Sequence, residues 1–362
     1  MANVLDYLDW RGDLPFPSAP FCEVDNLILS LLAYMDFSDP ERSAEDPPLL
    51  SEAAERFFRL HPRKKGALGV LLPDQFYDLL ERAAKSRRFG SLRLLAHENR
   101  VDEELETQFS ATTFTLDSRM TFVAFRGTDD TIIGWKEDFN MSYRFPVPAQ
   151  EEALRYLERV AEMVSGPLLV GGHSKGGNLA VYAAAFCAPA VQNRIHRVWS
   201  NDGPGFFPQV LACPEYRAVR DRICSILPRS SIVGVILDSD SETVLVESSA
   251  VGPMQHDGMT WQVLGPAFVR AKGPSRSSRQ ADRTFQSLVQ EMAPEQRREF
   301  AETLFSAFKE LGTSTLTDLA NRERLATLRV LGDRLANFDK GTRDSFFRSM
   351  RAVLRADDDE TE

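Results

Sequence analysis

Residues 168–180, LLVGGHSKGGNLA, decide the fold of this chain. They contain the pattern G-x-S-x-G as Gly172, Ser174 and Gly176. A short apolar run typical of a buried strand precedes the pattern, and a small-residue segment typical of a helix follows it. A serine on such a strand-to-helix turn is a nucleophile elbow, which presents its hydroxyl at the carboxyl end of a sheet. The stretch therefore predicts Ser174 as a nucleophile.

The residues beside Ser174 have physical roles in this turn. Gly172 and Gly176 lie where a side chain would collide with the neighbouring strand and helix. The Lys175 amide opens the helix, where its N–H is placed to donate to an oxyanion. Adjacent side chains point apart at a helix start, so we expect Lys175 to be a surface cation within reach of substrate rather than a member of a Ser–Lys dyad.

Strands and helices alternate through most of the chain. The predicted strands are 91–96, 106–116, 120–125, 167–171, 197–200 and 243–246, with 231–237 as a further candidate. The predicted helices are 24–37, 52–59, 73–86, 150–163 and 175–187. Residues 109–116 alternate as a half-buried strand does, whereas residues 121–125 are apolar throughout, as in a central strand. This order predicts the α/β class, with a mostly parallel central sheet and helices on both faces.

The chain divides into three parts. Residues 1–280 are interpreted as one catalytic domain with an N-terminal arm, irregular over residues 1–22 and helical from residue 24. Residues 281–355 are charged and helical, as a cap or subdomain would be. Residues 356–362 form an acidic tail that we expect to be disordered.

The composition argues against several functions. Lys and Arg number 43 against 53 Asp and Glu, and the net charge of −10 disfavours nucleic acid as a partner because phosphate binding needs a basic face. The sequence contains no signal-like leader and no apolar run near ~18 residues, so we expect a cytoplasmic protein without a transmembrane segment. The scattered cysteines predict buried thiols rather than disulfides or a zinc site. They are Cys22, Cys187, Cys213 and Cys224.

The order of catalytic groups along the chain selects the base. In hydrolases built around such an elbow, the nucleophile is followed by an acid and then by a histidine. His61 and His97 precede the elbow, and His173 lies within it. His196 begins its predicted strand, so it is expected at the opposite end of the sheet from Ser174. His256, in a loop after the predicted strand 243–246, is therefore the candidate base.

The acid has two candidates. Asp202 directly follows the predicted strand 197–200, which places it at the same sheet edge as Ser174. Asp238 follows the candidate strand 231–237, and Asp257 is too close to His256 in sequence to orient its ring. We favour Asp202, with Asp238 as the alternative, to hold the imidazole tautomer and stabilise the imidazolium. A role for Asp202 as a turn cap before Gly-Pro-Gly is the structural alternative.

A second oxyanion donor is expected from the loop after the central strand. Residues 125–128, FRGT, end that strand in a tight turn, and the Thr128 amide, with or without its hydroxyl, is the candidate donor. The following loop, 129–148, covers the site or lines an acyl pocket, or else is a packed structural loop. Its apolar residues are Ile132, Ile133, Trp135, Phe139 and Phe145.

The motifs FRGT and GHSKGGNLA (172–180) resemble those of the class 3 lipase group of α/β-hydrolases. Together with residues 4–13 and 24–37, SNDGPGF (200–206) and MQHDG (254–258), they are similar to an uncharacterised bacterial branch of that group, catalogued as a domain of unknown function. The resemblance covers about residues 1–265. It implies the α/β-hydrolase fold, with Ser174 as nucleophile, His256 as base and Thr128 at the oxyanion hole.

The chain departs from the class 3 pattern at two places. These lipases usually carry their acid in a D-x-V-P turn, and the equivalent residues here, 231–234, read SIVG, with Ser231 in place of the aspartate. The change puts the usual acid position in doubt and favours Asp202. The group also usually has leucine where Lys175 stands, and a cation there argues against a purely apolar triglyceride pocket.

The sequence thus predicts a serine hydrolase that cleaves carboxylic esters, lipase- or esterase-like, through an acyl-enzyme on Ser174. No cofactor or metal is required, and the partner is a small-molecule or lipid ester, with transient contact to a membrane surface allowed. One rival is a non-catalytic α/β-hydrolase-like module for protein interaction, which the serine at position 231 favours. The other is the same triad acting on a thioester or amide.

Overall fold

The computed structural model describes residues 1–38, 46–64, 74–102, 104–117, 120–129, 131–280, 282–283 and 293–310. Its centre is a seven-stranded sheet in which the strands lie in chain order. They are β1 (Arg93–Asp102), β2 (Thr107–Thr115), β3 (Thr121–Phe125), β4 (Leu168–His173), β5 (Ile195–Asn201), β6 (Ile223–Pro228) and β7 (Glu242–Val246). The first three pair antiparallel and β3 to β7 pair parallel. Strands β8 (Val263–Leu264) and β9 (Ala267–Phe268) form a separate hairpin.

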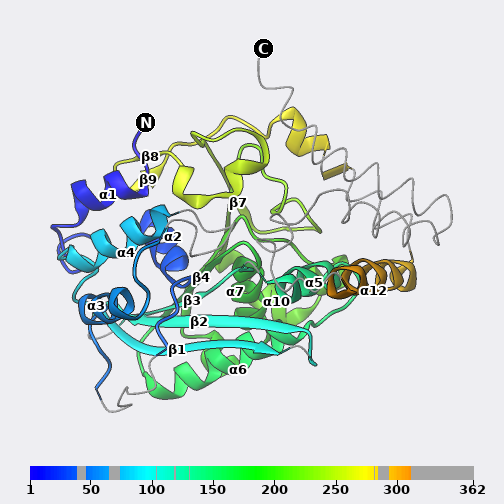
Figure 1. Cartoon of the computed structure of the whole chain (residues 1–362), viewed down its shortest axis with the longest axis horizontal. Coiled ribbons are helices and arrows are strands. Elements are labelled where there is room, and N and C mark those ends of the chain that lie inside the picture. Colours follow the sequence, from blue (N-terminus) through cyan, green and yellow to red (C-terminus); the bar gives the residue numbers. More distant parts are fainter. Residues whose placement is uncertain are drawn as a thin grey trace.

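Helices cover the sheet on both faces (Figure 1). In the described part of the chain they are α1 (Val4–Arg11), α2 (Glu23–Leu32), α3 (Leu50–Leu60), α4 (Gln75–Lys85), α5 (Ile132–Asn140), α6 (Pro148–Met163), α7 (Lys175–Phe186), α8 (Pro189–Gln192), α9 (Pro208–Leu211), α10 (Pro214–Val219) and α12 (Pro294–Glu310). This mostly parallel sheet with flanking helices and a strand-to-helix elbow between β4 and α7 confirms the predicted α/β-hydrolase fold.

The core lies on both sides of the sheet because successive side chains of a strand point to opposite faces. In β3, Phe122 and Ala124 pack into a core shared with α2, whereas Val123 and Phe125 pack into a core shared with α6 and α7. With both faces covered, β2 is buried along nearly its whole length. The prediction that residues 109–116 form a half-buried strand is therefore wrong. The alternation of apolar and polar residues shows which face of the sheet each side chain is on, but not whether helices cover that face.

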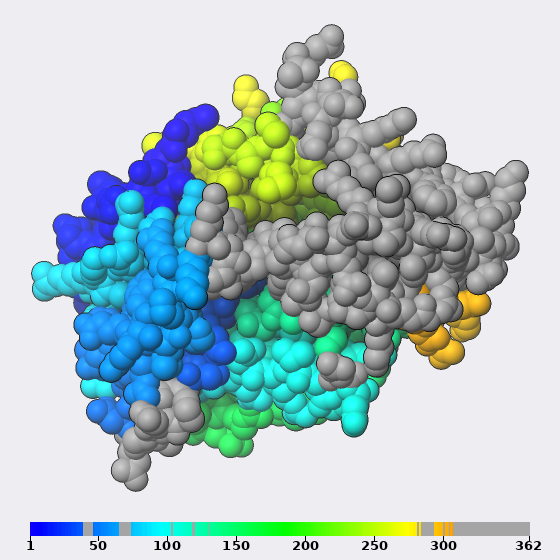
Figure 2. Space-filling view, viewed as in Figure 1, coloured from blue at the N-terminus to red at the C-terminus, as the bar shows by residue number. Residues whose placement is uncertain are grey.

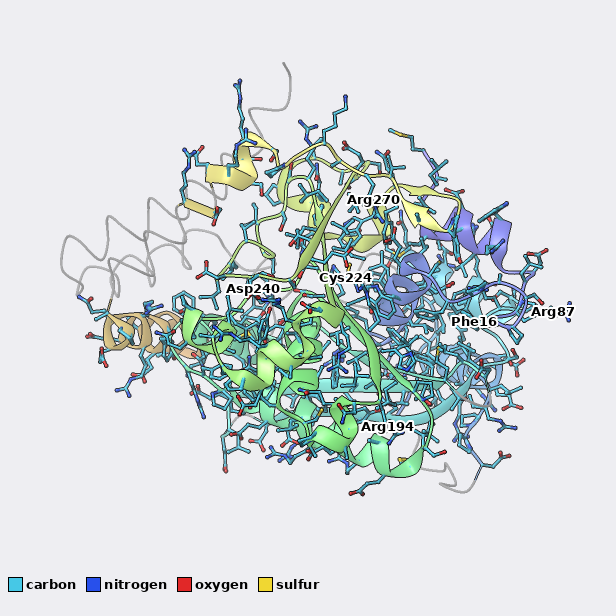
Figure 3. The ribbon with its side chains drawn as sticks, turned by 180° about the vertical axis from the view of Figure 1, so that it is seen from behind. Phe16, Arg87, Arg194, Cys224, Asp240 and Arg270 are labelled. Atoms are coloured by element: carbon cyan, nitrogen blue, oxygen red, sulfur yellow. The ribbon has the colours of Figure 1, made fainter. Side chains whose placement is uncertain are left out.

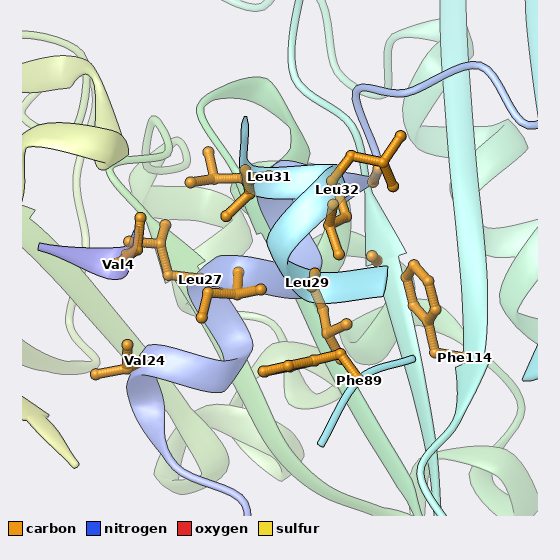
Figure 4. Close-up of a cluster of buried hydrophobic side chains, with 14 of the residues drawn as sticks. Val4, Val24, Leu27, Leu29, Leu31, Leu32, Phe89 and Phe114 are labelled. Carbon is orange, nitrogen blue, oxygen red and sulfur yellow. The ribbon is translucent and has the colours of Figure 1, made fainter. Parts of the chain in front are cut away.

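Helix α2 is buried from Val24 to Leu32, and its buried polar side chains Asp25 and Asn26 are hydrogen-bonded to other segments of the chain. Figure 4 shows Leu29 of this helix beside Phe89, and Leu27 on the side of Val4 of α1. The helix thereby joins the N-terminal helices to the sheet.

The N-terminal arm predicted to be irregular over residues 1–22 contains α1, so that prediction is wrong for residues 4–11. The Asn3 side chain accepts the amides of Leu5 (2.9 Å) and Asp6 (3.3 Å), and the Asp6 side chain accepts the Asn3 amide (2.8 Å). This reciprocal capping box satisfies backbone donors that would otherwise be unpaired at the helix start. On the face shown in Figure 2, the dark-blue N-terminal segment adjoins the yellow-green segment, and the Val263 amide donates to the Ala2 carbonyl (2.8 Å).

Two arginines hold distant segments together. The buried Arg88 guanidinium forms a bidentate pair with Asp25 of α2 (2.5 and 2.7 Å) and donates to the carbonyls of Leu14 (3.0 Å) and Ala19 (2.9 Å). It therefore anchors the segment between α1 and α2. Arg194, labelled in Figure 3, donates to three carbonyl oxygens at the end of α6 and fixes that end beside the start of β5.

Three further segments differ from the sequence predictions. Residues 231–237 are turns rather than a strand, and the strand before Asp238 is β6, which the sequence did not reveal. The predicted loop 129–148 contains α5, capped by Thr131, whose side chain accepts the Gly134 amide (3.2 Å). The four thiols are free, but only Cys187 and Cys224 are buried, and the other two are partly exposed.

Helix α12 belongs to the predicted C-terminal helical region 281–355. It packs against α5 through Ala301 and Phe305, which contact Ile132 (Figure 1). The rest of that region from residue 311, including its leucine-rich stretch, and the acidic tail 356–362 lie outside the described residues.

Candidate active site

Ser174 sits at the turn between β4 and α7 in a conformation that few non-glycine residues adopt. Its backbone angles are φ 58° and ψ −133°. A Cβ on Gly172 would lie 2.2 Å from the Gly176 carbonyl oxygen, and one on Gly176 would lie 2.1 Å from the Phe125 carbonyl oxygen. Both contacts are impossible, which confirms that the two glycines let β3, β4 and α7 approach closely enough to form the elbow.

Asp202 and His256 are brought together by the fold. Asp202 follows β5, the neighbour of β4 in the sheet, and His256 ends the short 3-10 helix Gly252–His256. The Asp202 Oδ2 atom lies 2.7 Å from Nδ1 of His256. The carboxylate is fully buried, while the imidazole is partly exposed. This arrangement can hold the imidazole with Nδ1 toward the acid and Nε2 free for proton transfer.

The other candidate groups lie elsewhere. Asp238 is exposed and forms backbone hydrogen bonds with Phe206 in both directions. His196 is exposed at the amino end of β5, opposite the edge that carries Ser174, as the sequence predicted. Of the two acids that the sequence left open, Asp202 is the one in contact with His256.

A second histidine, His173, lies directly beneath His256. The two ring centroids are 4.7 Å apart, and the His173 Nε2–H donates to the His256 carbonyl oxygen (2.8 Å). Because Nε2 carries the proton, Nδ1 accepts from the Tyr34 hydroxyl (3.1 Å). Burial, with the nearby charge of His256, lowers the pKa of His173 to about 3. His173 is therefore a neutral support that holds the backbone of His256 in place.

The predicted oxyanion residue Thr128 is tied to an acid on α5. Its hydroxyl donates to Oδ2 of Asp138. Burial raises the pKa of Asp138 to about 6, while the Lys175 ammonium and the bond from Thr128 act in the opposite direction. Since the hydroxyl has one proton and donates it to Asp138, the Thr128 amide is the group left for an oxyanion.

The Lys175 side chain corrects the sequence prediction of a surface cation. It is 1% exposed and its Nζ donates to Glu137 (3.0 Å) and to both the backbone and side-chain oxygens of Gln108 (each 2.9 Å). Glu137 is fully buried and also accepts the Ala149 amide (2.8 Å). The ammonium thus ties α7 to α5 and β2, because a charge without such partners would not remain buried.

A cavity of about 340 Å³ opens over these groups and is lined by Ser174, His256, Thr128 and Asp138. Most of its wall is apolar. The apolar lining comes from Tyr34, Phe76, Trp135, Met141, Pro204, Val233, Ile236, Leu237, Pro253 and Met254. In segment 129–148, Trp135 lines this cavity, whereas Ile132 and Phe139 pack toward α12.

Sequence reasoning missed Glu137, Tyr34 and the contacts of Ser231. Glu137 gave no signal, since a charged residue in a polar segment usually faces water. Tyr34 follows α2, about 140 residues before the elbow it supports. Within the described ranges, no three His, Cys, Asp or Glu side chains gather as ligands for a metal ion. In the same ranges no helix combines the length and apolar character needed to cross a membrane.

Comparison with known proteins gives a family and several structural likenesses. The profile of the Mbeg1-like family matches residues 83–306, and no curated protein sequence matches the chain. Among solved structures, the chain is similar to the M37 lipase, with 15% identity, a TM-score of 0.39 and coverage of 59% of this chain and 70% of that one. Lipase II from Rhizopus niveus has 15% identity, a TM-score of 0.33 and coverage of 44% and 68%. A triacylglycerol lipase whose catalytic centre is formed by a serine protease triad has 12% identity, a TM-score of 0.36 and coverage of 61% and 79%.

Proposed function

We propose that this chain, which belongs to the Mbeg1-like family, is a serine hydrolase that cleaves carboxylic esters through an acyl-enzyme on Ser174. The observation that carries the proposal is the 2.7 Å pair between Asp202 and His256 at the wall of the cavity that Ser174 also lines. A nucleophile on a strained elbow, a base and a buried acid in that order along the chain are the groups that acyl transfer needs.

The reaction follows from these positions. Nε2 of His256 takes the Ser174 hydroxyl proton as the oxygen attacks the ester carbonyl, and returns it to the leaving alcohol. Asp202 keeps the other proton on Nδ1 and stabilises the imidazolium that forms. The amides of Thr128 and Lys175 hold the oxyanion. Water, activated by His256 in the same way, then releases the acyl group.

The cavity wall supports an ester with an apolar acyl group. Apolar side chains make up most of the lining, and the buried Lys175 charge is compensated by Glu137 rather than presented to the cavity. The sequence argument that a cation beside the nucleophile opposes an apolar pocket therefore no longer holds. A lipase- or esterase-like substrate fits better than an anionic one.

The serine at position 231 was the feature that favoured a non-catalytic module. Asp202 now supplies a carboxylate to His256 from the adjacent strand end, so that feature no longer weighs against catalysis. A thioester or amide would use the same groups, and no described contact favours either bond over an ester.

Labelling with a fluorophosphonate probe tests the proposal. We expect the wild-type protein to label, and Ser174→Ala and His256→Ala to lose labelling because the nucleophile or its base is gone. His196→Ala is the matched control, since it removes an exposed histidine from the opposite end of the sheet. A folded wild-type protein that does not label would refute the proposal and favour the binding module.

A further inference from the structure

The turn after β6 lies directly against the proposed acid. The Ser231 hydroxyl donates to Oδ1 of Asp202 at 2.5 Å, and the Gly234 amide approaches the same oxygen at 3.2 Å. Oδ2 of Asp202 faces His256. Each carboxylate oxygen therefore has its own donor, one from the turn and one from the base.

The Ser231 hydroxyl has its direction set by its own turn. The hydroxyl oxygen accepts a hydrogen bond from the Gly234 amide at 3.0 Å. The single proton of the hydroxyl therefore points away from the turn, toward Asp202. Ser231 is 2% exposed, so water does not compete for that proton. The turn presents a preformed donor to the carboxylate.

Residue 234 must be glycine for this turn to reach the acid. A Cβ there would lie 2.5 Å from Oδ1 of Asp202, 2.9 Å from the Ser231 hydroxyl oxygen and 2.4 Å from a methyl carbon of Leu227. These contacts are shorter than real Cβ atoms make. The backbone of residues 231–234 thus forms a cradle shaped to the carboxylate, which a turn present only to connect β6 and β7 would not require.

We propose that Ser231 is a positioning residue, whose hydroxyl holds the Asp202 carboxylate toward His256 and so controls how strongly His256 binds its proton. This inference rests on the proposed serine hydrolase function. The Ser231 proton neutralises part of the negative charge on Asp202. Its removal leaves a more basic carboxylate that stabilises the imidazolium, so that at acidic pH a larger fraction of His256 is already protonated and cannot take the Ser174 proton.

Other groups around His256 are the same in any variant of Ser231. His173 packs beneath the ring, Asp138 lines the same cavity, and Asp257 is the next residue. Burial keeps His173 neutral with a pKa near 3 and raises the pKa of both Asp138 and Asp257. A change seen on altering Ser231 alone is therefore attributable to its bond with Asp202.

The kinetic test compares Ser231→Ala and Ser231→Cys with wild type across pH. Hydrogen bonds to charged groups are worth enough to change a rate constant by about 10- to 100-fold, so we expect kcat/KM to fall roughly tenfold or more in Ser231→Ala. The acid limb of the kcat/KM profile should move to higher pH by about half a unit. Ser231→Cys keeps a weaker donor, so its kcat/KM and its acid limb should lie between those of wild type and Ser231→Ala.

Ser225→Ala is the matched control. It removes another buried hydroxyl of the same strand region, one that bonds Ser241 at 3.0 Å instead of the acid. Its acid limb should coincide with that of wild type. A fall in kcat in Ser231→Ala without any movement of the acid limb would show a merely structural role and overturn the proposal.

An NMR titration of the His256 imidazole separates this inference from the proposed function. The titration needs no turnover. It therefore measures the effect of the Ser231–Asp202 hydrogen bond on the His256 imidazole even in a protein that hydrolyses no ester. We expect the titration midpoint to be higher in Ser231→Ala than in wild type and in Ser225→Ala. Equal midpoints in all three proteins would refute the positioning role, whatever the labelling experiment shows.

Discussion

Replacing Lys175 by methionine should strongly destabilise the fold, although the residue stands next to the nucleophile. Lys175 and Glu137 are 1% and 0% exposed and are joined at 3.0 Å. Methionine fills similar space without charge, which leaves the Glu137 carboxylate buried with only the amides of Gln108 (3.1 Å) and Ala149 (2.8 Å). Two neutral donors do not replace an ammonium ion.

The magnitude follows from the burial of both partners. Removing one partner of a buried ion pair costs about 3–5 kcal/mol, because the other charge is left without compensation. For a large domain that corresponds to a fall in Tm of roughly 5–15 °C. Changing Glu137 to glutamine in the same chain should recover part of the loss. The two substitutions should therefore couple by about 1–3 kcal/mol in a double-mutant cycle.

Urea and thermal unfolding, followed by circular dichroism, measure the four proteins of the cycle. Lys85→Met is the control, since Lys85 pairs with Glu81 at the surface, with side chains 74% and 44% exposed, and its loss should leave Tm nearly unchanged. A surface cation at position 175, as the sequence suggested, predicts the same small effect for Lys175→Met. A Lys175→Met protein as stable as wild type, with additive effects in the cycle, would refute the buried pair.

Two further predictions concern the elbow and the oxyanion loop. Gly172→Ala should destabilise the protein by about 3 kcal/mol or more, since its Cβ would meet the Gly176 carbonyl at 2.2 Å, whereas Gly273→Ala, with open space around it, should be neutral in the same unfolding assay. Equal stabilities of the two variants would contradict the close approach. Asp138, whose pKa burial raises to about 6, binds its proton more tightly folded than unfolded, so its contribution to stability falls as pH rises from about 4 to 6. The stability of Asp138→Asn should not show that fall. The difference in Tm between the variant and wild type should therefore favour the variant more at pH 7 than at pH 4. A difference in Tm that is constant across this range would refute the raised pKa.

The elements that carry the site were largely predictable because they are encoded locally. Runs of apolar residues with period two or near 3.6 mark most strands and helices around the elbow, and the observed bounds differ from the predicted ones by a few residues. Two misses have local causes that periodicity does not show. Residues 231–237 are apolar enough for a strand, but the Ser231 hydroxyl bonds the Gly234 amide and turns the chain. Helix α1 is only eight residues long, so its buried face of Val4, Tyr7 and Leu8 gives a short pattern, and its start is set by the Asn3 cap.

The choice of the acid was only half decided by the sequence. The ends of the predicted strands favoured Asp202, at the edge that carries Ser174, but Asp238 remained the alternative as long as residues 231–237 were interpreted as a strand. The fold separates them. Asp238 lies exposed beyond the turns, whereas Asp202 is enclosed between the ends of β5 and β6 and contacts His256.

The sequence by itself predicted the elbow and most of the strands and helices around it, because these depend on residues near one another in the chain, and the order of groups along the chain made His256 the candidate base. Only the tertiary structure decided the electrostatic partners. Lys175 meets Glu137 across 38 positions, Ser231 meets Asp202 across 29, and His256 meets Asp202 across 54. The physical reason is that a buried charge is stabilised by the groups that the packed sheet and helices bring within about 3 Å. Local periodicity in the sequence does not show which distant residues those groups belong to.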